Sequence, residues 1–484
     1  FMTDIRSLWT SEEATELTGG SSSTDWNATG VSIDSRTIGP GDLFIPISGP
    51  YFDGHNFIEN ALTRGAVASI TSGSTGDFPE GTHLLKVTDT IKALNELGRG
   101  GRNRSMARVV AVTGSVGKTG VKEALGRLLS EQGKTSFSMG SYNNHFGVPL
   151  SLARLPKNAD YGIFELGMNH SGELKQLSQI VRPHVAVVTT VDIAHTEFFS
   201  SIDDIARAKA EVFTGLQEGG TAILNRDNQY FDLLNSAALF AGAGKVIAFG
   251  VHNDAQFKLV EFTLNSGGSS VKVCFDNNMF TYQLSLPGQH WVQNSLAVLA
   301  AVYAVGADMT AAARSFVNIK PFKGRGQLHT IPIQDGFFEL IDDSYNACPV
   351  SVAAAIEVLS RLEPKSPGRR ICVLGDMKEL GENSIKLHCA LANKISDALV
   401  DFVFTVGSEM KYMCDQLPNT IKMEHADRSE DLIQPLLNVI KPDDIILVKG
   451  SASCQMSKVV DRLLDFKNDL NVSPNGIKEG SYVI

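Results

Sequence analysis

The sequence predicts an α/β protein made of three domains, and three observations support this fold class. The chain has 484 residues, which is more than a single hydrophobic core usually serves. Short apolar runs alternate with amphipathic helical patterns along most of it, as expected for mostly parallel sheets covered by helices. One apolar run leads through a glycine-rich turn straight into a helical pattern, a form typical of phosphate binding.

The composition excludes several classes of protein. The chain has 43 Lys and Arg against 53 Asp and Glu, and the net charge of −10 argues against non-specific nucleic-acid binding. Because no apolar run reaches membrane-spanning length and no secretory leader is recognised, we expect a cytoplasmic protein without membrane insertion. The six cysteines show no C-x-x-C pair and no metal-ligand spacing, as expected of reduced thiols. We further expect a monomer that acts on small molecules.

Residues 1–104 are predicted to form a small α/β N-terminal domain. A helix is expected to begin at Thr10, and short strands broken by Gly-Pro turns precede a second helical stretch. The triplet DSR at 34–36 has two interpretations of equal weight. It is either a diphosphate or nucleotide-sugar site with Arg36 as the anion partner, or a solvated turn with a surface ion pair. The stretch GRGGRNRS, residues 98–105, is predicted to be a linker.

Residues 105–325 are predicted to form a central P-loop ATPase-like domain with a mostly parallel sheet. Helical patterns separate five apolar strand candidates, which span residues 109–112, 161–166, 185–190, 221–224 and 246–249. Residues 257–286 alternate differently, with Gly-Gly and Asn-Asn turns, and predict a small antiparallel β segment, either inserted or at an edge. A helix with Asn294 follows, and the domain closes at Arg325.

The turn GSVGKT joins the first of these strands to a helix and predicts a phosphate-binding loop. Gly114 and Gly117 leave the backbone bare, so that its N–H groups face an anion together with the helix N-terminus. Lys118 is then placed to reach the terminal phosphates, and the Thr119 hydroxyl to bind magnesium. The full pattern G-x-x-x-x-G-K-[ST] needs one more glycine, where Val112 stands. The alternative is a glycine-rich connector that binds nothing.

Polar residues follow the predicted strands of the central domain, where the ligands of parallel sheets bind. Glu165 ends one strand and His195 follows another, while Asn143 and Asn144 lie in a loop before a helical stretch. Oxygen ligands from Glu165 and Thr119 suit Mg-ATP, with His195 as a third ligand or a supporting group.

Residues 326–484 are predicted to form a C-terminal Rossmann-like domain, with strands at 338–341, 371–374, 402–406 and 445–448 and helices beginning near residues 349, 384, 428 and 453. Asp342 and Asp343 end a strand before Ser-Tyr-Asn, which is typical of a ribose- or base-binding turn. The acidic loop that begins at Asp376 is equally typical of a solvent-exposed surface loop. In the central domain, spacing alone predicts that Lys209 is an exposed helical lysine paired with nearby acids.

Taken together, the motifs resemble the Mur ligase family over nearly the whole chain. They are DSR, DGHNF, TGSVGKTGVKE, YNNHFGVPLSL, ELGMNHSGEL, IAHTEFF, IARAKAEVF, GRGQ, DDSYNACP, VLGDMKELG and LVKGS. The resemblance implies an ATP-dependent amide ligase of peptidoglycan precursor synthesis that uses Mg²⁺. Its substrates would be UDP-MurNAc-tripeptide and D-alanyl-D-alanine, joined through an acyl phosphate on the terminal carboxylate of the tripeptide.

The resemblance also implies roles for individual residues. The catalytic residues would be Lys118, His195 and Lys209, the last as a carbamate. Magnesium would be held by Thr119, Glu165, His195 and the Lys209 carbamate. ATP would be bound by Gly114, Ser115, Gly117, Lys118, Thr119, Asn294, Arg325, Asp343 and Asn346, and the UDP-sugar and peptide by Ser35, Arg36, Asn143 and Asn144. The three domains would bind UDP-MurNAc, ATP and D-alanyl-D-alanine in that order, and the last would close on ATP.

Three positions depart from the family pattern. Gly120 stands where a second hydroxyl residue is usual, so we expect an altered helix start with unchanged chemistry. Ala452 and Gln455 replace basic residues in the turn after LVKGS, which leaves only Lys449 as a candidate for a contact there. Two alternative functions stay open. One is a sibling ligase that adds the third amino acid to a dipeptide substrate, and the other is a non-catalytic nucleotide-binding switch.

Overall fold

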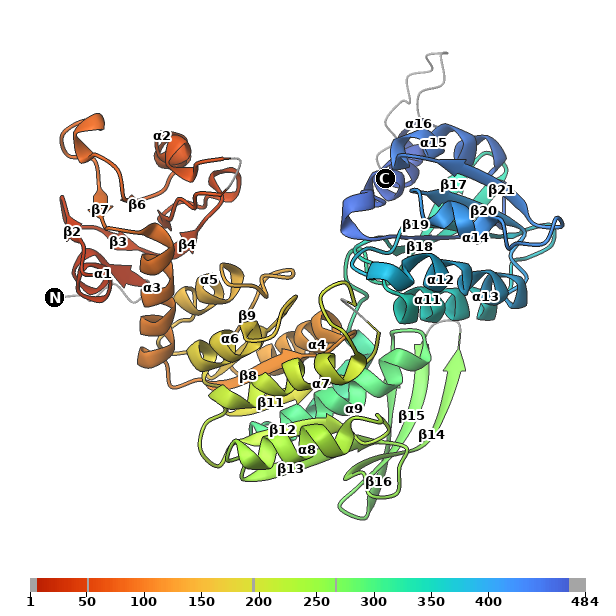
Figure 1. Ribbon diagram of the computed structural model, residues 1–484, viewed down its shortest axis with the longest axis horizontal. Helices are drawn as coiled ribbons and strands as arrows, with labels where there is room; N and C mark the ends of the chain where they lie inside the picture. The colour runs from red at the N-terminus through yellow and green to blue at the C-terminus, as the bar shows by residue number, and fades with distance from the viewer. Residues whose placement is uncertain (1–6, 50–51, 194–195, 266–267, 470–484) are drawn as a thin grey trace, which may run out of the picture.

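The computed structural model describes residues 7–49, 52–193, 196–265 and 268–469. They form three lobes that follow one another along the chain (Figure 1). The main sheet of the N-terminal lobe lies within residues 21–86, that of the central lobe within 108–284 and that of the C-terminal lobe within 327–449. Their main sheets have five, nine and six strands. The predicted α/β fold class is therefore confirmed. Nowhere in these ranges is a helix both long and apolar enough to cross a membrane.

In the N-terminal lobe the strand order is β2-β7-β6-β5-β4, with β4 to β7 parallel and β2 antiparallel. The elements are β1 (Trp9–Thr10), α1 (Ser11–Thr18), β2 (Ser21–Ser22), β3 (Asn27–Ala28), β4 (Gly30–Ser32), β5 (Asp42–Phe44), α2 (Ile58–Thr63), β6 (Ala68–Thr71), β7 (Leu84–Lys86) and α3 (Thr90–Arg104). The predicted helix start is confirmed, because the Thr10 side chain accepts a hydrogen bond from the Glu13 N–H at 3.1 Å and caps α1.

The predicted linker at 98–105 is wrong, because this stretch is the last part of α3. Its glycines allow close packing against α5 (Gly147–Ala153). A Cβ atom on Gly98 would lie 2.9 Å from the carbonyl oxygen of Pro149, and one on Gly101 would lie 2.2 Å from that of Leu152. The glycines that suggested flexibility therefore mark a helix–helix contact without room for a side chain.

The central sheet has the order β16-β15-β14-β13-β12-β11-β8-β10-β9. Its strands are β8 (Arg108–Thr113), β9 (Thr135–Phe137), β10 (Tyr161–Glu165), β11 (Val185–Val188), β12 (Thr221–Asn225), β13 (Lys245–Gly250), β14 (Phe257–Asn265), β15 (Gly268–Phe275) and β16 (Asn278–Leu284). All five predicted strands are present and parallel. The predicted antiparallel segment is also confirmed, and it extends the same sheet at one edge through β14, β15 and β16.

Helices cover both faces of this sheet, and the side chains of β8 alternate between the two cores that result. Val110 and Val112 are buried in a core with α4 (Lys118–Ser130), α9 (Gln289–Ala304) and α10 (Met309–Ser315). Val109 and Ala111 are buried in the opposite core with α5, α6 (Glu173–Val181), α7 (Ile202–Ala210) and α8 (Phe231–Phe240). Because successive side chains of a strand face opposite ways, a continuous apolar run serves two cores at once.

The C-terminal sheet has the order β17-β18-β22-β19-β20-β21, with only β17 antiparallel to its neighbour. Its strands are β17 (Gln327–Ile333), β18 (Gly336–Asp343), β19 (Arg370–Gly375), β20 (Phe402–Val406), β21 (Lys422–Ala426) and β22 (Ile445–Lys449). The four predicted strands are confirmed. The two edge strands β17 and β21 were missed, because Pro332 interrupts the first and the second is mostly exposed and polar.

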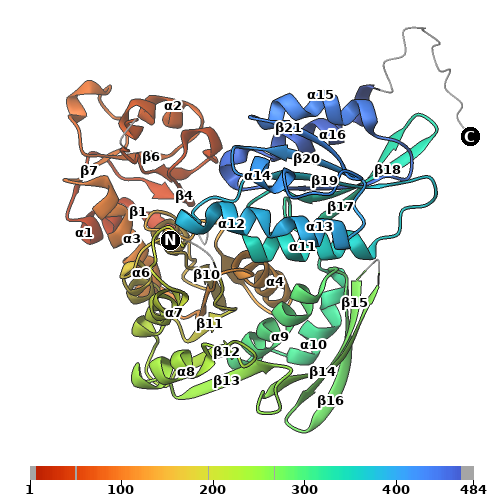
Figure 2. The same cartoon turned by 45° about the vertical axis from the view of Figure 1, so that its right-hand side comes forward.

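The helices of this lobe are α11 (Pro349–Arg361), α12 (Ser384–Cys389), α13 (Leu391–Asp397), α14 (Met410–Cys414), α15 (Ser429–Val439) and α16 (Ser457–Asp469). Three of the four predicted starts match, and the fourth, near residue 453, falls on a short 3-10 turn before α16. Helices α11, α12 and α13 lie on the side of the lobe that faces the central lobe (Figures 1 and 2).

The central and C-terminal lobes are in direct contact. The Glu197 N–H donates to the Glu379 carbonyl at 3.1 Å, and the Thr196 hydroxyl donates to the Leu380 carbonyl at 3.0 Å. These bonds join the loop after β11 to the loop after β19. Both loops leave the carboxyl ends of parallel strands, the edge at which ligands of such sheets bind.

We predict that Gly101→Ala destabilises the protein by about 1–3 kcal/mol, because the added methyl group must push α3 away from Leu152. At an exposed helical position the same substitution would stabilise the protein by about 1 kcal/mol, so the sign of the change is informative. The apparent Tm from thermal unfolding measures it, with the exposed Arg99→Ala on the same helix as the control. A Tm raised by Gly101→Ala would contradict the packing role of this glycine.

Candidate active site

The turn between β8 and α4 has a backbone that requires glycine at two positions. Gly114 has φ +148° and Gly117 has φ +85°, and both values lie in a backbone region that residues other than glycine rarely adopt. A Cβ atom on Gly114 would lie 1.9 Å from the Thr189 hydroxyl oxygen, and one on Gly117 would lie 2.7 Å from the Asn294 amide oxygen. The predicted strand–turn–helix context of the GSVGKT loop is thus present, and Asn294 of α9 lies directly against it.

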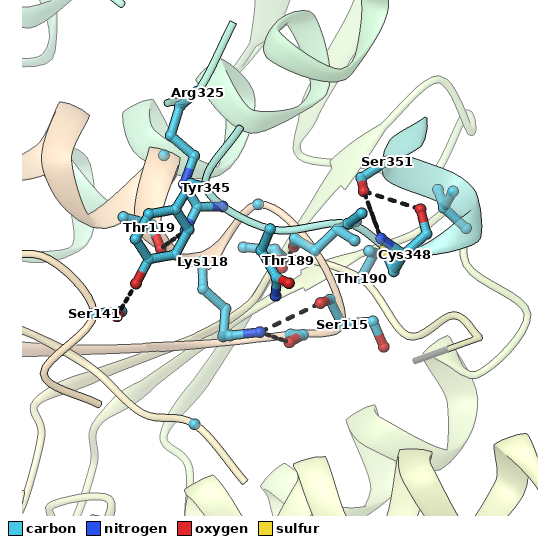
Figure 3. A pocket seen from close by; sticks show the side chains of 18 of the residues that line it. Ser115, Lys118, Thr119, Ser141, Thr189, Thr190, Arg325, Tyr345, Cys348 and Ser351 are labelled. Atoms are coloured by element: carbon cyan, nitrogen blue, oxygen red, sulfur yellow. Dashed lines mark hydrogen bonds between the residues drawn. The ribbon is translucent and has the colours of Figure 1, made fainter. Parts of the chain in front are cut away.

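Lys118 is the first residue of α4 and is folded back onto the loop (Figure 3). Its ammonium group donates to the carbonyl oxygens of Gly114 at 2.7 Å and Ser115 at 3.3 Å. Burial lowers the pKa of Lys118, and the Glu165 carboxylate opposes part of that change. The cation therefore lies inside the turn whose N–H groups would face a phosphate.

Glu165 ends β10, directly beside Val112 of β8. Its side chain is only 1% exposed, and its Oε1 accepts a hydrogen bond from the Asn143 amide at 2.7 Å. Within the described chain, Oε2 is buried and has no hydrogen-bond partner. A buried carboxylate oxygen without a partner costs folding free energy, so this atom marks a position for a cation.

Magnesium is the cation that suits these groups. Besides Glu165, the Thr119 hydroxyl lines the same cavity and could supply a second oxygen, and it accepts a hydrogen bond from Arg325 at 3.1 Å. Nowhere in the described ranges do three His, Cys, Asp or Glu side chains gather as a metal site. A site with few protein oxygens matches Mg²⁺, which keeps waters and shares phosphate oxygens.

Lys209 is not the exposed, paired lysine that helical spacing predicts. It is on the inner face of α7, only 1% exposed, and no described carboxylate forms an ion pair with it. Burial lowers its pKa well below the ordinary value, and the nearby Lys118 charge adds to the effect. His195, the other group predicted here, lies outside the described residues.

The C-terminal lobe adds a second set of polar groups. The Asp343 carboxylate accepts a hydrogen bond from the Lys449 ammonium at 2.6 Å, and Lys449 also donates to the Asn346 carbonyl at 3.0 Å. The guanidinium of Arg325 lies 4.1 Å from the centre of the Tyr345 ring, and the Tyr345 hydroxyl contacts Ser141 of the central lobe (Figure 3). Tyr345 therefore bridges the two lobes.

All of these groups line one cavity of about 950 Å³, at the upper end of the usual size range for ligand pockets. The predicted site residues that line it are Gly114, Ser115, Gly117, Lys118, Thr119, Asn143, Asn144, Glu165, Lys209, Asn294, Arg325, Asp343 and Asn346. Ser35 and Arg36 are not part of its lining. Arg36 forms a 2.7 Å ion pair with Asp34, and its side chain is 85% exposed. That geometry matches the surface ion pair considered for this triplet and leaves the arginine open to solvent.

Sequence reasoning missed several residues of the cavity and its supports. Trp291 lies against Gly120, where a Cβ atom would come 2.9 Å from the indole ring, so the glycine at this departure makes room for the tryptophan. The neighbouring His290 is exposed and lines the cavity. Tyr345 could have been identified from the sequence, because it belongs to the Ser-Tyr-Asn turn that follows two acidic residues at the end of a strand.

Lys122 was also missed as a support of the site. This fully buried lysine of α4 donates to the Glu123 carboxylate at 2.5 Å and to the carbonyl oxygens of Ser138 at 2.7 Å and Gly140 at 2.9 Å. All three ammonium donors are thereby used. Lys122 thus ties the helix after the phosphate loop to the segment that leads to Asn143.

Comparisons with known proteins agree with this geometry. The Mur ligase family catalytic domain matches residues 27–97, the Mur ligase middle domain residues 112–302, and the Mur ligase glutamate ligase domain residues 324–452. The UDP-N-acetylmuramoyl-tripeptide–D-alanyl-D-alanine ligase of Rickettsia prowazekii is 33% identical over 94% of this chain and 99% of its own. The ligase of the same name from Escherichia coli is 36% identical over 92% of this chain and 95% of its own.

Solved structures show the same relationship. MurF from Acinetobacter baumannii superposes with a TM-score of 0.80 at 29% identity, covering 94% of this chain and 99% of the other. MurF ligase from Thermotoga maritima in complex with ADP superposes with a TM-score of 0.73 at 26% identity, covering 91% and 98%. Because similarity extends over nearly the full length of both chains in sequence and in structure, the chain belongs to the Mur ligase family.

Proposed function

We propose that this chain joins D-alanyl-D-alanine to UDP-N-acetylmuramoyl-tripeptide with ATP as the energy source, releasing ADP and phosphate. The observation that carries the proposal is the single cavity shared by the GSVGKT loop, the buried Glu165 and the strand-end residues of the C-terminal lobe. The full-length similarity to ligases of that name supports the same substrates. We place the reaction in the cytoplasm and assign it to a monomer.

The residues of the cavity suit phosphoryl transfer to a carboxylate. The tripeptide carboxylate oxygen attacks the γ-phosphorus of ATP, ADP leaves, and an acyl phosphate forms. The amine of D-alanyl-D-alanine then attacks the carbonyl carbon, loses a proton and expels phosphate, which leaves an amide. Such transfer needs positioning and charge neutralisation more than covalent help. Lys118 and the N–H groups at the start of α4 supply positive charge where the phosphates lie.

Magnesium would be held by Thr119 and Glu165, and it would neutralise charge on the phosphate oxygens. The buried Oε2 of Glu165 supports this assignment. We propose Lys209, as a carbamate, for a second ion, with His195 beside it on the strength of the family resemblance. A carbamate forms when a neutral amine attacks CO₂ and releases a proton. The low pKa of Lys209 favours the neutral amine that this reaction needs.

We further propose a division of labour among residues 1–104, 105–325 and 326–484. The first would bind UDP-MurNAc with Ser35 and Arg36, since Arg36 is exposed and held by Asp34. The second would bind ATP and pass the peptide along Asn143 and Asn144. The third would bind the incoming dipeptide and close on ATP. Arg325 supports this closure, because its guanidinium spans from Tyr345 to Thr119.

The proposed reaction is tested by phosphate release from ATP with purified substrates. We expect turnover only when UDP-MurNAc-tripeptide and D-alanyl-D-alanine are both present, with a mass-spectrometric product of their combined mass less water. Turnover with UDP-MurNAc-dipeptide and a diamino acid instead would identify the sibling ligase. Nucleotide binding without substrate-dependent hydrolysis would identify a switch.

We predict that Lys209→Ala abolishes ligation and that short carboxylic acids partly restore it, because they supply the oxygens of the missing carbamate. The measurement is the initial rate of phosphate release with and without added acid. Lys175→Ala, at an exposed lysine of α6, is the control and should leave the rate unchanged. An unimpaired Lys209→Ala variant would refute the carbamate.

We predict that Lys122→Met raises KM for UDP-MurNAc-tripeptide about tenfold or more, because each carbonyl left unpaired costs about 1–3 kcal/mol and loosens the segment before Asn143. ADP affinity, measured by calorimetry, should change less than about threefold, since the three partners of the Lys122 ammonium group lie outside the GSVGKT loop. The exposed Lys134→Met is the control. If both substrates weaken equally, Lys122 supports the whole fold rather than this segment.

A further inference from the structure

The cavity contains five lysine and arginine residues of the described chain, and four of them have evident partners or roles. They are Lys118, Lys209, Arg325, Lys378 and Lys449. Lys118 is bound to the carbonyls of its own loop, Arg325 to Thr119 and Tyr345, and Lys449 to Asp343, while Lys209 is buried beside Lys118. Lys378 differs from them, because its side chain is 44% exposed.

Lys378 retains donors for a ligand. Its ammonium donates to the Asp376 carboxylate at 2.9 Å. An ammonium group has three donors, and Asp376 takes one of them. Burial lowers the pKa of Lys378, but the Asp376 carboxylate more than offsets this and holds the pKa above its ordinary value. The side chain therefore carries a full positive charge at neutral pH, at the wall of the cavity that the C-terminal lobe supplies.

The lysine is also held in place. Asp376 is only 1% exposed, and its Oδ1 accepts hydrogen bonds from the N–H groups of Glu409 at 3.1 Å and Met410 at 2.8 Å. Gly407 makes room for this carboxylate, since a Cβ atom there would lie 2.3 Å from the Asp376 Cγ. The Lys378 N–H donates to the Ser451 hydroxyl at 2.9 Å. A cation anchored through its backbone and its ammonium is pre-organised for a ligand.

The proposed acceptor has a charge that needs such a partner. D-alanyl-D-alanine has an amine at one end and a carboxylate at the other, about 7 Å away in an extended dipeptide. The amine must reach the acyl phosphate, which forms beside Lys118 and Glu165 on the central lobe. The carboxylate would then extend toward the C-terminal lobe, where Lys449 is already paired with Asp343 and the turn after it lines the cavity with the neutral Ser451, Ala452 and Ser453. A carboxylate left there without a cation would lose binding free energy.

We propose that Lys378 binds the free carboxylate of the acceptor and so selects a dipeptide with an unblocked C-terminus. This assignment rests on the proposed function and extends it to a residue that determines acceptor specificity. Asp376 is the positioning residue, because it touches the lysine and not the ligand. Lys378 takes no part in forming the acyl phosphate, so its removal should weaken the use of the acceptor and leave the use of ATP intact.

The test combines a change in the enzyme with a change in the acceptor. Rates are measured with D-alanyl-D-alanine and with D-alanyl-D-alaninamide, which lacks the carboxylate charge. For the unaltered enzyme, we expect kcat/KM to be about 10–100-fold lower with the amide, the usual worth of a charge-assisted hydrogen bond. In Lys378→Met, kcat/KM for the dipeptide should fall to a similar extent, and the difference between the two acceptors should disappear. KM for ATP and for UDP-MurNAc-tripeptide should change less than about twofold.

Lys378→Arg should keep most of the discrimination, and Lys394→Met, at an exposed lysine of α13, should keep all of it. The ratio of acid to amide is measured within one variant, so a partial loss of folded protein leaves it unchanged. If Lys378→Met discriminates as strongly as the unaltered enzyme, the carboxylate is bound elsewhere and the assignment is overturned. Absence of ligation by the unaltered enzyme, observed before any substitution, overturns the proposed function and this assignment with it.

Discussion

The bare backbone of the turn after β8 is the constraint on which the rest of the site depends. Gly114 and Gly117 have φ values that favour glycine, and the space of their absent side chains is taken by Thr189 and Asn294. Side chains larger than glycine at these two positions would therefore displace the end of β11 or α9. The nine-stranded sheet, with its two cores, holds those elements fixed. The sheet in this way maintains a row of N–H groups and the half-buried Lys118 in position for phosphate.

Around that turn the protein buries ionisable groups that lack a full set of partners among the described residues, which costs stability. Glu165 has an oxygen without a partner, and Lys209 is buried without a described carboxylate beside it. A buried lysine with a lowered pKa, such as Lys209, is typical of functional sites. The C-terminal lobe completes the site rather than forming one of its own, because Tyr345 contacts Ser141 of the central lobe and Arg325, which in turn binds Thr119. In the proposed reaction, the central lobe would carry out phosphoryl transfer and the C-terminal lobe would select the acceptor.

Much of the fold was predictable from local pattern, whereas the packing of particular residues was not. The strands around residues 109–112 and 371–374 are continuous apolar runs, and such runs are typical of parallel strands that are buried on both faces. The glycines of α3 resembled a linker, because a sequence does not show that α5 lies against them. Lys209 looked exposed for the same reason. Only the family resemblance suggested the role proposed for it, since helical spacing does not reveal which face a helix buries.

The proposed reaction depends on one bond, which forms between the tripeptide carboxylate and the phosphoryl group. It is tested by labelling both oxygens of that carboxylate with ¹⁸O and analysing the released phosphate by mass spectrometry after a single turnover with D-alanyl-D-alanine. The account predicts that each phosphate molecule contains one ¹⁸O atom, because the acyl phosphate carries a carboxylate oxygen away when the amine attacks. Unlabelled phosphate, with the lost ¹⁸O recovered in water, would contradict it.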